Sequence, residues 1–429
     1  MTKYVNSSEG LPSQLHLWSP LPTQTGILAT RLIDVYPNNS IDSSDTISFT
    51  IPALERLMLD SVEVFTELRV LTKEGTDPAD KANVSTAPHL GAILWRNVEV
   101  SSGGVSLTQS YDNSYAMFKF WDDAIHHGSD EGAFLKRKEG MLLDSVGDKS
   151  ESENVVYFPE TGTPKNVNGQ SRAKRISKGQ KAFLCSKLNV SIFNQATLLP
   201  TNLEFQVQLT KNYDETILLS AADDTSKIKF DRVFLRCKFQ QPRDEILNLL
   251  EVKLAKRNAI YHADKMLMNI HPISTKSVTI DNLFNGPLPY FFYVGIQDRS
   301  AFGKAREKNP FSIHLIESAQ LYVNGVEYFP QKLKMTDHDE TNMSVALAEA
   351  TGSRKDNFIL HHFRVYPALG FDLTQDKTQN QHGMNLNRTG NVRIVLEQLN
   401  DVRLERVLFT LAYYDRVIEI DKDRRLFAI

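Results

Sequence analysis

The chain has 429 residues, 41% hydrophobic and 24% charged, with a formal net charge of −3. This length exceeds what one hydrophobic core usually serves and predicts two domains of about 200 residues each. The small net charge excludes strong long-range attraction to nucleic acid or an acidic membrane, and no apolar run approaches the roughly 20 residues of a membrane span.

Two features favour an intracellular site of folding. The first ten residues, MTKYVNSSEG, lack the apolar stretch of a secretory signal. The two cysteines, Cys185 and Cys237, lie in apolar strand-like runs, where buried free thiols in a reducing compartment are expected. A single bridge between these two cysteines is the alternative.

Residues 1–30 are predicted to form an N-terminal arm rather than a domain. They are polar and proline-rich, with a short apolar cluster at Leu15, Leu17 and Trp18. An apolar cluster in a segment this short cannot be buried in a core of its own. We therefore expect the arm to dock on a neighbouring surface, and a simple tail is the alternative.

Residues 31–224 are predicted to form the first β-domain. Ile47, Phe49 and Ile51 alternate with polar residues, which is typical of a half-buried strand. A strand pair is expected over 93–107, and helical spacing of apolar residues predicts a short helix within 111–126. The polar stretch 128–180 is predicted to be a long insertion with little regular structure.

Residues 225–429 are predicted to form the second β-domain, opening with the alternating strand Ile228–Phe239. A helix is expected over 247–257. The strand at 288–297 is apolar on both faces and is therefore predicted to be central in its sheet. A second polar insertion is expected at about 331–357.

The two halves share a recurring strand–turn–strand pattern. Asn324-Gly325 and Gly103-Gly104 are both dipeptides that tolerate the positive φ of a two-residue hairpin. A recurrence about half a chain apart is too long for a solenoid repeat and indicates tandem domains. With roughly eight strands per half, the predicted fold is all-β: two tandem eight-stranded jelly rolls with loop insertions and a few short helices.

The sequence contains none of the common catalytic or nucleotide-binding motifs that we searched for: GxGxxG, GxxxxGK[ST], GxSxG or HExxH. The adjacent histidines at 126–127 and 361–362, and the acidic group at 337–340, lack metal-ligand spacing. Basic residues at 136–138 and 172–181 lack interleaved aromatic side chains, so at most weak phosphate contact is expected. We predict no enzyme activity, cofactor, metal site or specific nucleic-acid recognition.

Several phrases, taken as an ordered set, resemble the capsid proteins encoded by Polinton/Maverick elements and the related adintoviruses. The first is Leu15–Thr25 (LHLWSPLPTQT), where Trp18 and Leu21-Pro22 depart from that family's pattern. The later phrases follow in the family's order: Lys178–Lys181 (KGQK), Lys308–Phe311 (KNPF), Leu321–Gly325 (LYVNG), Phe371–Thr374 (FDLT), Gly390–Ile394 (GNVRI) and Val417–Arg424 (VIEIDKDR).

The resemblance implies a double jelly-roll major capsid (hexon) protein of a virus or virus-like transposon. Such a protein would form homotrimers with a pseudo-hexagonal outline, contact neighbouring capsomers and a penton protein, and reside in the virion. Its candidate assembly contacts are the arm residues Leu15, Leu17 and Trp18 and the insertion residues Val155, Tyr157 and Phe158. Core filling is the alternative role for the insertion residues.

Two other functions remain open from the sequence. A minor, pentameric vertex protein needs only one jelly roll, so the recurrence argues against it. A receptor- or carbohydrate-binding β-sandwich would present exposed aromatic clusters on one set of loops, and the sequence shows none.

Overall fold

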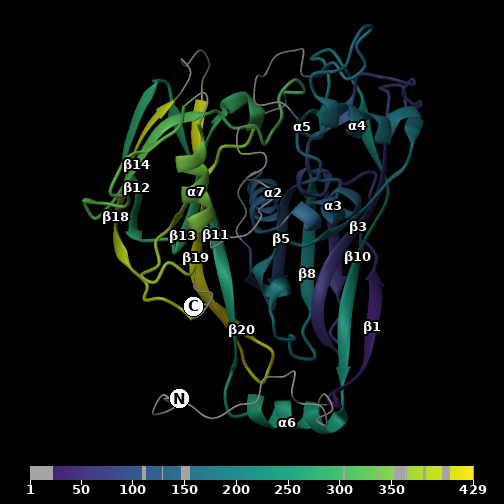
Figure 1. The fold of residues 1–429 in the computed structure, drawn as a ribbon. Helices are drawn as coiled ribbons and strands as arrows, with labels where there is room; N and C mark the ends of the chain where they lie inside the picture. Colours follow the sequence, from purple (N-terminus) through teal and green to yellow (C-terminus); the bar gives the residue numbers. More distant parts are fainter. Residues whose placement is uncertain are drawn as a thin grey trace, which may run out of the picture.

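The computed structural model describes residues 23–108, 113–127, 129–145, 155–302, 305–336, 339–351, 363, 365–379, 383–398 and 406–428. Strands dominate these ranges, and they form two antiparallel sandwiches side by side (Figure 1). We call these sandwiches the first roll and the second roll. None of the described helices is long and apolar enough to cross a membrane.

The first roll packs two four-stranded sheets face to face. One sheet has the order β1-β10-β3-β7, and the other has the order β2-β8-β5-β6. The strands are β1 (Ile27–Val35), β2 (Thr46–Ile51), β3 (Met58–Leu71), β5 (Trp95–Ser102), β6 (Val105–Ser106), β7 (Ala182–Lys187), β8 (Phe205–Lys211) and β10 (Lys227–Pro242). A short two-stranded sheet, β4 (Ser85–Thr86) with β9 (Leu218–Leu219), lies beside them.

The second roll has the same plan. Its sheets have the orders β11-β19-β13-β17 and β12-β18-β14-β15, with β20 beside β19 and β16 beside β14. The strands are β11 (Ala259–Ile273), β12 (Ser277–Pro287), β13 (Phe291–Asp298), β14 (Ile316–Val323), β15 (Val326–Glu327), β16 (Leu333–Lys334), β17 (Leu369–Asp372), β18 (Thr389–Gln398), β19 (Arg406–Ile420) and β20 (Leu426–Ala428).

The two rolls share one topology. If the eight main strands of each roll are numbered along the chain, both rolls have sheets of order 1-8-3-6 and 2-7-4-5. This is the connectivity of a jelly roll, in which Greek-key crossings carry the chain between two packed sheets. The predicted fold of two tandem jelly rolls is confirmed.

Alternation of apolar and polar side chains builds these sheets. In β2 and β3, buried and partly exposed residues alternate along most of the strand, as expected for a strand with one face on a core. β13 is different because all eight of its residues are buried. Phe292 packs against Phe284 of the opposite sheet, with ring centroids 5.0 Å apart, while its neighbours point to the other face. β13 therefore has both of its faces covered, and because it pairs with both β17 and β19 it is central in its sheet, as predicted.

The recurring hairpins occupy equivalent places in the two rolls. Asn324 (φ 52°) and Gly325 (φ 79°) connect β14 to β15, and Gly103 (φ 57°) and Gly104 (φ 82°) connect β5 to β6. Both pairs have the positive φ of a type I′ turn, and both join the fourth and fifth strands of their roll. The hairpin prediction and the half-chain correspondence are confirmed.

Replacing Gly325 by Val should destabilise the protein by roughly 1–3 kcal/mol, because a β-branched residue is strained at positive φ. A Cβ at this position would meet no atom within 4 Å, so the cost is conformational rather than steric crowding. Gly325→Asn is the matched control, since Asn tolerates the left-handed region. Equal unfolding midpoints for the two variants in denaturant would contradict the turn assignment.

Helices lie between the strands. The helices predicted near 111–126 and 247–257 are α2 (Ser114–His126) and α6 (Asp244–Leu254). The others are α1 (Leu90–Ile93), α3 (Ser129–Lys138), α4 (Val167–Ile176), α5 (Asp214–Ile217) and α7 (Thr341–Ala350), with 3-10 turns at Ser177–Gly179, Ser191–Asn194 and Arg299–Phe302. The insertion 128–180 is therefore more regular than predicted, because α4 buries Arg172, Ala173 and Ile176.

Two predicted domain limits need correction. The strand predicted to open the second domain is β10, which pairs with both β1 and β3 and completes the first roll. Its inward side chains, such as Val233 and Leu235, fill the first core. β1 begins at Ile27, so residues 27–30 belong to the first roll rather than to the arm. Alternation identifies a strand, but it does not reveal which sheet the strand joins.

Candidate assembly interfaces

Helix α2 joins the two rolls along an aromatic interface that we call the interdomain seam. Phe118 of α2 meets Tyr413 of β19 edge-on, with ring centroids 5.3 Å apart. The Tyr413 hydroxyl donates to Asp122, and the Tyr293 hydroxyl lies 3.2 Å from His126 Nε2. α2 thus covers the outward face of the sheet β11-β19-β13-β17, and this coverage explains why β13 is buried on both sides.

Two partly buried carboxyl groups lie in this seam. Burial raises the pKa of Asp122 to about 6, although hydrogen bonds from Tyr413 and Asn189 favour its charged form. Burial likewise raises the pKa of Asp264 to about 6 against a 2.9 Å hydrogen bond from the Tyr290 hydroxyl. In an unfolded chain the pKa of an aspartate lies near its ordinary value of 3.8. Between pH 3.8 and about 6, the folded protein therefore binds more protons than the unfolded chain.

Asp264→Asn should make the protein more stable at pH 8, by up to about 3 kcal/mol, because the wild type must bury a carboxylate there. The amide that replaces the carboxyl keeps an oxygen that can accept from Tyr290. The raised pKa means that wild-type stability increases as pH falls from about 7 to 4. The advantage of the variant should therefore fall to about a third of its full size at pH 4.5 and vanish only below the unfolded-chain pKa of 3.8.

Denaturant unfolding of both proteins between about pH 4.5 and 8 measures this effect. Asp281→Asn, which removes a mostly exposed carboxyl, controls for the loss of a surface charge. An Asp264→Asn variant whose stability difference from wild type did not change with pH would contradict the assignment.

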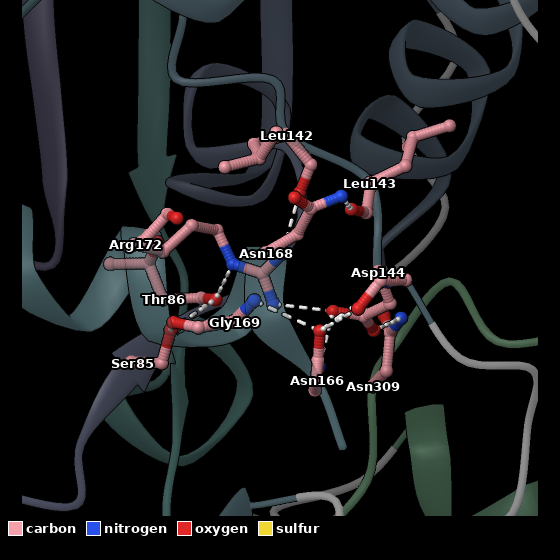
Figure 2. A network of polar contacts seen from close by, with 12 residues as sticks. Ser85, Thr86, Leu142, Leu143, Asp144, Asn166, Asn168, Gly169, Arg172 and Asn309 are labelled. Atoms are coloured by element: carbon pink, nitrogen blue, oxygen red, sulfur yellow. Dashed lines mark hydrogen bonds and ion pairs between the residues drawn. The ribbon is translucent and has the colours of Figure 1, made fainter. Parts of the chain in front are cut away.

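A second contact between the rolls is centred on the buried ion pair of Arg172 and Asp144 (Figure 2). Arg172 Nη2 lies 2.6 Å from Asp144 Oδ1, while its Nε and Nη1 donate to the backbone carbonyls of Thr86 and Leu142. Asn166 donates to the same carboxylate oxygen at 2.8 Å. The guanidinium thus ties α4 to two separate segments of the first roll, β4 and residues 142–144.

The other oxygen of Asp144 faces the second roll. It accepts a 2.7 Å hydrogen bond from Asn309 Nδ2, which also donates to the Tyr366 hydroxyl at 3.1 Å. Two residues later, Phe311 stacks on Phe120 of α2 with ring centroids 4.1 Å apart. The KNPF phrase noted in the sequence therefore supplies contacts that hold the second roll to the first.

One group of described residues, His89, Asp123 and Glu139, has the spacing of metal ligands. The buried Lys119 ammonium lies 2.7 Å from Asp123 Oδ2 and 2.8 Å from Glu139 Oε2, so a cation already occupies the centre of the group. Burial raises the pKa of Asp123, but Lys119 and the two neighbouring histidines outweigh it and hold that pKa well below its usual range. We assign the cluster to anchoring α2, because the ammonium forms ion pairs with both carboxylates.

Among the described residues, large apolar side chains stay exposed on the outward face of the sheet β1-β10-β3-β7. Leu28, Leu32 and Tyr36 of β1 and its following turn, with Phe183 of β7, expose 56–62% of their surface. We call these residues, together with Phe65, Phe234 and Arg236 between them, the outer face of the first roll. In that group, Phe65 stacks on Phe234 at 5.0 Å, and the Arg236 guanidinium lies 4.3 Å above the Phe65 ring.

This outer face and the interdomain seam are topological equivalents. Each is the outward side of a sheet of order 1-8-3-6, and each carries aromatic residues on its third and eighth strands. In the second roll these residues are Tyr293 and Tyr413, and α2 buries them. In the first roll they are Phe65 and Phe234, and no described element of this chain covers their exposed neighbours. Aromatic residues with arginine are typical of interface centres.

The structure describes three of the six predicted assembly residues. Leu15, Leu17 and Trp18 lie outside the described residues. Val155 and Tyr157 are buried in a small cluster with Ala173 and Leu219, with Phe158 partly buried against it. Because Tyr157 has no exposed surface, it fills the core of its own subunit and cannot be an intersubunit contact. Burial in the single chain favours the alternative role, core filling, for Val155 and Tyr157.

The polar groups singled out in the sequence form contacts within the chain. Lys138 pairs with Glu63 at 2.5 Å and Lys181 with Glu67 at 2.6 Å, which neutralises part of the two basic runs. His126 lies in the seam, whereas 361–362 and 337–338 fall outside the described residues. Cys185 and Cys237 are both free, on β7 and β10, and burial raises the pKa of each thiol to about 12.

No family model and no curated protein matches the chain by sequence. Solved structures do match it along nearly its whole length. A chain of the Sputnik virophage particle is 11% identical, with a TM-score of 0.65, covering 99% of this chain and 93% of that one. The Faustovirus major capsid protein gives 10% identity and a TM-score of 0.61, covering 94% and 93%. The mavirus major capsid protein gives 11% and 0.57, covering 100% and 96%. These likenesses establish the double jelly-roll fold for the whole chain.

Proposed function

We propose that this protein is a major capsid protein whose homotrimers form pseudo-hexagonal capsomers that tile an icosahedral shell. The observation that carries the proposal is the uncovered outer face of the first roll. Its counterpart in the second roll is buried by a neighbouring roll of the same chain, so the same kind of contact made between chains would bury Leu28, Leu32, Tyr36 and Phe183.

Such a contact is head-to-tail: the outer face of one copy meets the second roll of the next. Contacts of this type close into rings when the rotation between copies divides a full turn. A ring of three chains would contain six rolls, which agrees with the pseudo-hexagonal outline implied by the resemblance. It also agrees with the Faustovirus and mavirus neighbours, which are major capsid proteins.

The ordered sequence phrases support a finer assignment to the Polinton/Maverick and adintovirus type. KNPF and LYVNG have structural roles here, in the contact between the rolls and in the β14–β15 hairpin. In this assignment the protein resides in the virion, is made and assembled inside the host cell, and meets neighbouring capsomers and a penton protein. Its role is structural rather than catalytic.

Sedimentation of the purified chain tests the trimer. We expect a single species of three times the 48.6 kDa chain mass at micromolar concentration. An obligate interface should bury more than about 2,000 Å² and so should resist dilution and added salt. A clean monomer across salt and pH would refute the trimer, and a pentamer would favour the vertex-protein alternative.

A further inference from the structure

An apolar groove of about 730 Å³ lies at the end of the molecule where α6 carries the chain from the first roll to the second (Figure 1). α6 supplies Ile246 and Leu250, the start of β1 supplies Ile27, and β11 supplies Ile260 and Tyr261. Pockets of this volume can bury most of the surface of a drug-sized ligand, which is about as large as a few side chains.

The groove exposes apolar surface that the chain does not cover with its described residues. Leu250 is 38% exposed and Ile260 is 58% exposed, although both are large aliphatic side chains. Of all residues of α6, Leu254 alone is buried. A helix that connects two domains while leaving its apolar side open indicates a surface that another segment covers.

The chain itself provides a segment that fits. Residues 1–22 precede the first described residue, and the chain then enters the fold beside the groove, since Gly26 and Ile27 both line it. The preceding segment carries Leu15, Leu17 and Trp18 among polar residues. Trp18 is eight residues before Gly26, which permits a span of no more than about 29 Å.

Charge is compatible with this occupant. Residues 11–22, LPSQLHLWSPLP, contain no acidic residue and no lysine or arginine. The rim of the groove carries both signs, with Glu251, Lys253 and Arg257. A segment without formal charge therefore brings no like charge against that rim, and it can bury its apolar side chains without desolvating an ion.

We propose that the α6 groove is the docking site of the Leu15–Trp18 segment, with Trp18 as its main anchor. A tryptophan buries about 150–250 Å² and often dominates such contacts. The inference goes beyond the capsid assignment. It does not depend on the trimer, because the groove and the segment belong to the same chain.

Fluorescence of the full-length protein tests this site. Trp95 and Trp121 are both fully buried, so subtracting the emission of a Trp18→Phe variant isolates the signal of Trp18. We expect this signal to be blue-shifted and shielded from acrylamide in the wild type. Leu250→Glu and Ile260→Glu, on two different elements of the groove, should each shift the emission to the red and increase quenching.

Val252→Glu is the matched control. Val252 lies on α6 and is 56% exposed, but it does not line the groove, so its variant should leave the Trp18 signal unchanged. All three positions are exposed, and unchanged far-UV circular dichroism would verify that each variant folds. A Trp18 signal that is already solvent-exposed in the wild type, or that neither groove variant alters, would overturn the proposal. The groove would then belong to another occupant. A monomeric protein with a shielded Trp18 would refute the trimer but would still support the docking site.

Discussion

Leu32→Glu is expected to convert the trimer to monomers while leaving each chain folded. Leu32 is 62% exposed in the single chain, so its replacement should change chain stability by no more than about 0.5 kcal/mol. In the assembled ring the same side chain would lie under a neighbouring roll. Burying an added carboxylate in that contact costs several kcal/mol of desolvation, enough to lower the affinity by orders of magnitude.

Sedimentation at micromolar concentration measures this effect, and a thermal unfolding scan reports on the fold. Val252→Glu is the control, because Val252 is 56% exposed but lies on α6, outside both the outer face and the sheets of the second roll. A Leu32→Glu protein with wild-type mass would exclude this face from the assembly contact. A monomer that also unfolds earlier would show that the residue acts within the chain.

Arg172→Met should cost about 3–5 kcal/mol of stability. Removing the guanidinium leaves Asp144 as a buried carboxylate without its ion-pair partner and leaves the carbonyls of Thr86 and Leu142 without their donors. Met preserves most of the side-chain length, so loss of packing contributes little.

Denaturant unfolding of the Arg172→Met protein measures the cost. Lys174→Met, two residues along α4 at an exposed position, is the matched control and should change stability by less than about 0.5 kcal/mol. If the two variants unfolded at the same denaturant concentration, the ion pair would not hold the segments together.

Much of the fold could be predicted because local patterns determine it. Period-two alternation identified strands such as β2 and β3, and Asn324-Gly325 identified its hairpin because few dipeptides adopt positive φ twice. Pairing is not local. β10 has an ordinary amphipathic pattern, and only the three-dimensional structure shows that it inserts between β1 and β3 rather than opening the second roll.

The sites were harder to predict for the same reason. Arg172 stands in a basic run that looks solvated, and its partners lie far away: Thr86 is 86 residues back, and Asp144 contacts Asn309 across 165 residues. Tyr157 is a second case, since an aromatic residue in a polar insertion looks identical in sequence whether it faces a partner or its own core. The outer face of the first roll became visible as a candidate interface only when its equivalent in the second roll was seen to be covered.

Electron microscopy of the purified protein tests the central claim, that paired jelly rolls associate by covering the outer face of the first roll. The account predicts particles with threefold symmetry and a six-lobed outline, in which the strands β1 and β10 of each chain lie against the second roll of the next. Particles of one chain with that sheet open to solvent, or rings of five, would contradict it.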